Sequence, residues 1–167
     1  SLSPHDAERV NREVVRSALA SAEESGTTVA FVSRSDSTLR GHFPLEPATI
    51  SEELETATGA GADGIVVVPA FGDAGRITIG ATHYAGSMAS GFVPVGETEF
   101  AKDATFGYES SNLPEWVEEK TGGDMPAESV IVIDLTTLRE SKERTVDKLT
   151  SAKNGIAIVV DIVTEED

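Results

Sequence analysis

The sequence predicts an α/β fold: a three-layer domain with a mostly parallel sheet, helices on both faces and a β-hairpin insertion. Short apolar runs such as 64–69 are typical of strands that helices cover on both faces. These runs alternate with longer segments, such as 4–25, whose apolar residues recur at helical spacing. That alternation favours a parallel sheet. The segment 77–95 interrupts it with a glycine- and serine-rich turn between two apolar runs, which indicates a hairpin or flap.

Composition and charge limit the classes of function. A chain of 167 residues with 39% hydrophobic residues is expected to form one domain, residues 1–167, with a real core. The absence of cysteine excludes disulfides, thiolate catalysis and cysteine-based metal sites. No long apolar run or signal-like start is present, so we expect no membrane partner and a cytoplasmic location. A net charge of −16 argues against nucleic acid as a partner, because nucleic acid binding needs clustered Lys and Arg.

The first expected element is an amphipathic helix over about 4–25. Ser3 is its expected N-cap, Pro4 suits the first helical position, and Asp6 stands where a capping box has its acid. Gly26 supplies the stop. We expect the apolar face of this helix to pack on a sheet.

The later elements follow from the same signals. A second helix starts after Pro44, has Pro47 in its first turn and ends at Gly59 or Gly61. The other expected elements are strands over 27–32, 64–69, 129–133 and 156–160, a hairpin within 77–95, and helices over 113–120 and 136–152. Asp134 and Asp161 end two of the strands, where we expect them to cap helices or, less readily, to shape the sheet edge.

The polar loop 33–46, between an expected strand and an expected helix, is the main candidate site. It offers far more hydrogen-bonding capacity than a turn needs. Its candidate ligand-binding residues are Arg34, Asp36, Ser37, Thr38, Arg40, Gly41 and His42. The alternative is that Asp36, Ser37 and Thr38 only shape a turn through side-chain to backbone hydrogen bonds.

A second loop, 69–76, places another arginine near the first. The carboxyl ends of parallel strands meet at one sheet edge, so Arg76 is expected to approach loop 33–46. An arginine fork grips a carboxylate or phosphate, which predicts a small anion as ligand. The alternative is a surface arginine in a flexible loop. The glycines of this loop do not match a Walker phosphate loop.

Two further segments are candidates for the same site. His83, beside Tyr84 on the expected flap, either faces the ligand or is simply packed or exposed. The segment 96–112, which contains Glu97, has little periodicity, and irregular segments of this length are usually functional or mobile.

Ordered motifs along most of the chain resemble those of the four-carbon acid sugar kinase family. They are Ser-Arg-Ser-Asp-Ser-Thr-Leu-Arg-Gly-His at 33–42, Pro-Ala-Phe-Gly-Asp-Ala-Gly-Arg at 69–76, His83-Tyr84, Pro-Val-Gly-Glu-Thr-Glu-Phe-Ala-Lys-Asp at 94–103, Phe106-Gly107-Tyr108 and Ser111-Asn112-Leu113. Two positions depart from the family pattern. Many members have Lys in place of Arg34, and the second loop commonly reads Glu-Gly-Gly-Arg rather than Asp73-Ala74-Gly75-Arg76.

The resemblance implies an activity and an organisation. Members are ATP-dependent kinases that phosphorylate sugar acids such as threonate, erythronate or 3-oxo-tetronate. Their chains begin with a strand carrying Asp-Asp-x-Thr-Gly and have a C-terminal nucleotide-binding domain, and neither is found in these 167 residues. We therefore expect a fragment of the N-terminal sugar-acid-binding domain, inactive by itself. A non-catalytic sugar-acid sensor and an interaction domain with a vestigial site are the alternatives.

The resemblance also implies roles for the candidate residues. Asp36 would contact a substrate hydroxyl and is one candidate for the catalytic base, the family's Asp-Asp motif being the other. Arg40 and Arg76 would bind the carboxylate or the incoming phosphate. The remaining candidate substrate contacts are Arg34, Ser37, Thr38, Gly41, His42, His83 and Glu97. ATP and Mg²⁺ would be held largely by the other domain, with no dedicated metal site here, and the partners would be that domain and, in one version, a second copy of the chain.

Overall fold

A parallel sheet forms the centre of the protein in a computed structural model that describes residues 2–167. Its strands are β1 (Gly64–Val67), β6 (Ile156–Val160) and β5 (Ile131–Ile133), in the order β1-β6-β5. The register sets Val66 beside Ile158 on β6. All three strands run in one direction, so the predicted α/β class is confirmed.

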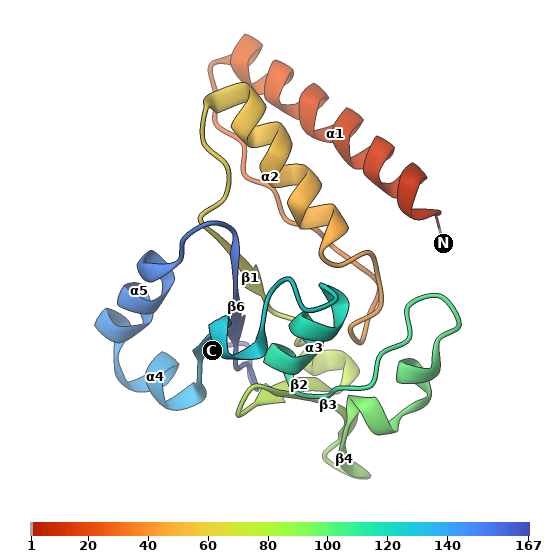
Figure 1. Cartoon of the computed structure of the whole chain (residues 1–167). Coiled ribbons are helices and arrows are strands. Elements are labelled where there is room, and N and C mark those ends of the chain that lie inside the picture. The colour runs from red at the N-terminus through yellow and green to blue at the C-terminus, as the bar shows by residue number, and fades with distance from the viewer. Residues whose placement is uncertain (1) are drawn as a thin grey trace.

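Helices cover both faces of this sheet at β6 and β5, as predicted, but β1 is open on one face, where Val66 is 53% exposed. On one face, α3 (Leu113–Lys120) packs into a core that includes Ala157 and Val159 of β6. On the other face lie α4 (Leu135–Glu140) and α5 (Lys142–Ser151) (Figure 1), and Leu138 of α4 packs in a second core with Ile133 and Ile158. Successive side chains of β6 therefore belong to two separate cores, one on each face of the sheet.

The remaining two long helices form a pair away from the sheet. α1 (Pro4–Ser25) packs against α2 (Leu45–Thr58), and the pair projects from the rest of the molecule (Figure 1). The prediction that α1 packs on a sheet is therefore wrong. The buried stripe of α1 runs through Ala7 and Val15, while Val14 is 58% exposed, so the helix faces a narrow neighbour rather than a broad sheet.

The ends of α1 follow the expected signals. The Ser3 hydroxyl oxygen accepts a hydrogen bond from the Asp6 backbone N–H at 3.1 Å. Gly26 closes the helix in the left-handed conformation with φ of 64°, where glycine carries no steric penalty. α2 ends at Gly59 in the same way, with Pro47 tolerated in its first turn.

Residues 27–32, predicted as a strand, are an extended and largely exposed coil. Val32 is 84% exposed. A strand exists only through pairing, and within residues 2–167 no neighbouring backbone hydrogen-bonds to this stretch beyond Thr27. The apolar pattern identified a segment with β propensity but not the partner it requires.

The predicted hairpin is present and belongs to an antiparallel sheet of its own. Its strands are β2 (Arg76–Ile79), β3 (Thr82–Ser87) and β4 (Gly91–Pro94), in that order. Gly86 donates a backbone hydrogen bond to Gly75 at 2.9 Å, and a Cβ on Gly75 would overlap the Gly86 carbonyl. Two glycines thus let the loop before Arg76 lie directly against β3.

Asp161 joins the two sheets and Asp134 caps a helix. The buried Asp161 carboxylate accepts hydrogen bonds from the backbone N–H groups of Gly80 and Ala81, both at 2.8 Å, which ties the β2–β3 turn to the end of β6. Its expected capping role is therefore secondary to shaping the sheet edge. Asp134 caps α4 as predicted, accepting from the Thr137 N–H at 2.7 Å.

The predicted helix over 136–152 is two helices, because Ser141 interrupts it. Its extended backbone and hydroxyl oxygen, which accepts from the Arg144 N–H at 3.2 Å, end α4 and cap α5. Short 3-10 turns complete the chain: η1 (Gly72–Ala74), η2 (Val95–Glu97), η3 (Glu99–Lys102) and η4 (Ala127–Ser129). None of the helices in residues 2–167 is long and apolar enough to cross a membrane.

Candidate functional site

The polar loop has an unusual backbone that the core holds in place. Thr38 and Leu39 have φ of 61° and 62°, values that non-glycine residues adopt rarely and at an energetic cost. Both are buried, Leu39 within the main apolar core, so packing fixes this conformation. Gly41 folds back on Ser35 so closely that a Cβ would lie 2.6 Å from the Ser35 Cβ. The main role of Gly41 is therefore to permit this shape of the loop.

Arg76 reaches this loop, as the sheet-edge argument expects. Its Nε donates a hydrogen bond to the Thr38 hydroxyl at 2.8 Å. The Tyr108 hydroxyl donates to the Thr38 carbonyl, also at 2.8 Å, and burial raises the pKa of Tyr108 to about 12. Three segments that are far apart in the sequence therefore meet at Thr38.

Arg40 lies between two carboxylates. Its guanidinium is 3.3 Å from Asp36 and 3.6 Å from Asp103, and its Nε donates to the Ser37 carbonyl at 3.0 Å. The backbone N–H groups of Phe106 and Thr105 lower the pKa of Asp103 below its ordinary value, so this carboxylate remains charged. Arg40 thus has its charge balanced within the protein.

The aromatic ring of Phe100 joins the two arginines. The Cζ atom of Arg76 is 4.8 Å from the ring centroid and that of Arg40 is 5.3 Å from it, both within the range of cation–π attraction. We call the set Asp36, Arg40, Arg76, Phe100 and Asp103 the arginine cluster. It brings together the three residues on which the sequence-based site depends.

A small hollow lies beside this cluster, with Asp36 common to both. It has a volume of about 160 Å³, below the roughly 300–1,000 Å³ typical of pockets for drug-sized ligands, and suits a small metabolite. It is lined by Leu2, Ala7, Arg34, Ser35, Asp36, Gly41, His42, Glu46 and Phe106. The His42 ring meets Phe106 edge-on at 4.8 Å, and its Nε2 is 2.9 Å from the Leu2 carbonyl oxygen. We call this cavity the polar hollow.

Two predicted ligand contacts are placed differently by the structure. His83 is fully buried, with Nδ1 3.0 Å from the Thr78 hydroxyl, and burial together with the charge of Arg76 lowers its pKa to about 4. It is a neutral core residue beneath the site, which agrees with the packed alternative. Glu97 is exposed on η2, and among the described residues no hydrogen bond or ion pair joins its side chain to the arginine cluster.

The contacts that the sequence did not predict come from the irregular segment 99–108. Phe100, Asp103, Phe106 and Tyr108 all contact loop 33–42. Lys120 pins this segment by donating to the carbonyls of Phe106 and Gly107 at 3.2 and 2.8 Å. The length and irregularity of 96–112 signalled a functional segment, but not which side chains it contributes.

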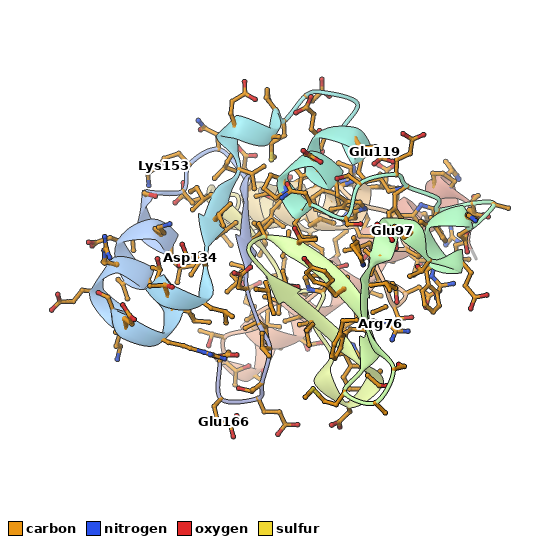
Figure 2. The ribbon with its side chains drawn as sticks, turned by 90° about the horizontal axis from the view of Figure 1, so that it is seen from below. Arg76, Glu97, Glu119, Asp134, Lys153 and Glu166 are labelled. Atoms are coloured by element: carbon orange, nitrogen blue, oxygen red, sulfur yellow. The ribbon has the colours of Figure 1, made fainter. Side chains whose placement is uncertain are left out.

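A larger cavity of about 450 Å³ lies elsewhere, near α4 and the end of the described chain. Its one arginine, Arg139, is already paired with Asp167 at 2.6 and 2.9 Å. In Figure 2 the neighbouring Glu166 and Asp134 lie apart from Arg76. We therefore place the candidate site at the arginine cluster and the polar hollow, where cations and hydroxyls converge. No group of three His, Asp or Glu residues suited to a metal ion occurs within residues 2–167.

The fold and the site together define an α/β domain whose polar loops bring guanidinium, carboxylate and hydroxyl groups together. A family model described as "Sugar-binding N-terminal domain" matches residues 1–167. The chain belongs to this family, and the resemblance to the four-carbon acid sugar kinase family is confirmed. No curated protein matches the chain in sequence.

Solved structures share the fold. A Haemophilus influenzae protein of the DUF1537 family has a TM-score of 0.64 and 17% identity, covering 99% of this chain and 37% of its own. A Salmonella typhimurium protein, named as a candidate tRNA synthase, has a TM-score of 0.60 and 19% identity, covering 91% of this chain and 34% of its own. The chain thus spans little more than a third of either neighbour's length.

Proposed function

We propose that this chain is the sugar-acid-binding domain of an ATP-dependent kinase that phosphorylates a four-carbon sugar acid such as threonate, erythronate or a 3-oxo-tetronate. The observation that carries the proposal is the position of Asp36. Its carboxylate lines the polar hollow and also pairs with Arg40 in the arginine cluster. A hydroxyl acceptor beside two guanidinium groups matches a ligand with hydroxyls at one end and a carboxylate at the other.

The arginine cluster and the polar hollow offer different chemical groups to the ligand. The arginine cluster supplies positive charge for the ligand carboxylate or the incoming phosphoryl group. The hollow supplies acceptors and donors for hydroxyls, from Arg34, Asp36, His42 and Glu46. Ser37, next to Asp36, is held by Arg40 through its hydroxyl at 3.2 Å. Asp36 is 60% exposed, so a ligand can reach it, and it is one of two candidates for the general base.

ATP supplies the phosphoryl group in this proposal, and Mg²⁺ accompanies it. Residues 2–167 provide no carboxylate and histidine group suited to the metal, so we assign ATP and Mg²⁺ to the nucleotide-binding domain. The part of this chain is to bind and orient the acceptor. A tRNA substrate, suggested by one neighbour's name, does not suit a chain of net charge −16.

Ligand-dependent thermal stability tests the proposal. Threonate, erythronate and their oxo forms are added to the complete protein, with the uncharged alditol threitol as control. A ligand at a hundred times its Kd stabilises the folded state by about 2.7 kcal/mol, which raises the Tm by roughly 5–10 °C for a domain of this size. No shift with any sugar acid would refute sugar-acid binding. Binding without ATP turnover in the complete protein would refute the kinase and favour the sensor.

A further inference from the structure

The two arginines of the arginine cluster have different partners. Arg40 faces the carboxylates of Asp36 and Asp103. Arg76 donates only to neutral oxygens, the Thr38 hydroxyl and the Ala74 carbonyl, and no ion pair involves it within residues 2–167. Hydroxyl and carbonyl acceptors orient a guanidinium but leave its full positive charge uncompensated.

Within the arginine cluster, Arg76 is the cation that no carboxylate of residues 2–167 compensates. Acidic residues outnumber basic ones 29 to 13, and the other arginine of the arginine cluster is already paired. An incoming carboxylate would have to displace Asp36 or Asp103 to pair with Arg40. It displaces nothing at Arg76, whose Nη2 makes no hydrogen bond in the described part of the chain. Within the arginine cluster, the lower-cost site for the ligand's charge is therefore Arg76. Arg34 in the polar hollow also forms no ion pair in the described residues, but it is exposed to solvent, which screens its charge.

Phe100 is the contact that holds Arg76 without neutralising it. The ring centroid lies 4.8 Å from the Arg76 Cζ, and the ring attracts the guanidinium through its π face. The same ring attracts Arg40, so both guanidinium groups are held at one aromatic ring. Phe100 lies on η3, at the start of the segment that Lys120 and the Tyr108 hydroxyl tie to the core and loop.

We infer that Arg76 is the anion anchor of the site and that Phe100 is the positioning residue that aims it, so that Phe100 sets the preference for a sugar acid over the corresponding uncharged sugar alcohol. This inference rests on the proposed function. It assigns Arg40 a different part, that of holding Asp36, Ser37 and the segment around Asp103 in place.

Calorimetric titration of the complete protein with threonate and with threitol tests this. Phe100→Leu keeps apolar volume but removes the ring. A cation–π contact contributes about 0.5–2 kcal/mol, so Phe100→Leu should weaken threonate binding roughly 2- to 30-fold while threitol binding is unchanged. Phe100→Tyr keeps the ring and should restore wild-type affinity. Arg76→Gln should weaken threonate at least about tenfold and spare threitol.

Phe106→Leu is the matched control, because Phe106 belongs to the same segment but faces His42 and the polar hollow. It should leave the ratio of threonate to threitol affinity unchanged. If threitol binds too weakly to measure, the salt dependence of threonate affinity replaces the ratio, and Phe100→Leu should flatten it.

Three results are distinguishable. Equal weakening of both ligands by Phe100→Leu, or no change in either, overturns the positioning role while the proposed function stands. Wild-type protein that binds threonate and threitol equally well overturns the anion anchor. Wild-type protein that binds no sugar acid overturns the proposed function itself, and the inference with it.

Discussion

Arg40→Ala is expected to lower kcat/KM for the sugar acid in the complete enzyme by at least about tenfold, the scale of a lost charge-assisted contact. The Arg40 guanidinium donates a hydrogen bond to the Ser37 carbonyl at 3.0 Å. It also lies 3.3 and 3.6 Å from the carboxylates of Asp36 and Asp103. Its removal leaves Asp36 and Asp103 uncompensated next to the place where an anion is to bind. The expected loss therefore combines a relaxed loop with direct repulsion of the ligand.

Two further variants separate these causes. Arg40→Lys keeps the charge but not the planar fork, so it should retain more activity than Arg40→Ala and less than the wild type. Adding Asp103→Asn to Arg40→Ala removes one repelling charge and should recover part of the loss. Steady-state kinetics on folded variants provide the measurement. Unchanged kinetics for Arg40→Ala would contradict any role of Arg40 at the site.

The sequence predicted most elements because their signals are local. Ser3 and Gly26 bound α1, the apolar run 64–69 contains β1, and Asp134 caps α4. The errors concern long-range partners. The coil at 27–32 has the side chains of a strand, but a strand also needs a neighbouring backbone. Local pattern likewise could not show that α1 faces another helix.

The candidate site likewise has residues that the sequence predicted and residues that it did not. The polar loop and Arg76 could be predicted because clustered guanidinium, carboxylate and hydroxyl groups at strand ends are recognisable in sequence. The burial of His83 could not, because it depends on how the antiparallel sheet packs on the loop. Phe100 was hidden for another reason: one aromatic residue in an irregular segment has no pattern of its own, and its role appears only when two arginines converge on it.

Glu53→Gln is expected to lower the Tm by about 5 °C, since the buried side chain exchanges charge-assisted hydrogen bonds from Arg12 and Arg16 for weaker neutral ones. Glu53 is 4% exposed. It accepts from Arg16 Nε at 2.7 Å and from Arg12 Nη1 at 2.8 Å. Glutamine keeps the shape and one acceptor but no charge. Glu13→Gln, which removes the exposed partner of Arg9, is the control and should change the Tm little.

The pH dependence of this effect has a definite sign. Hydrogen bonds from Arg16 and Arg12 lower the pKa of Glu53 below its ordinary value of 4.5. A carboxylate with a lowered folded-state pKa stabilises the fold above the unfolded-state value, and this contribution is lost as the pH falls through the folded-state pKa. The Tm difference between wild type and Glu53→Gln should therefore be constant near neutral pH and shrink below about pH 4.5. A difference that grows in acid would exclude the ion pair as its source. Because Leu2, which precedes α1, and Ala7, which lies within it, line the polar hollow, weakening this helix pair should also lower sugar-acid affinity in acid.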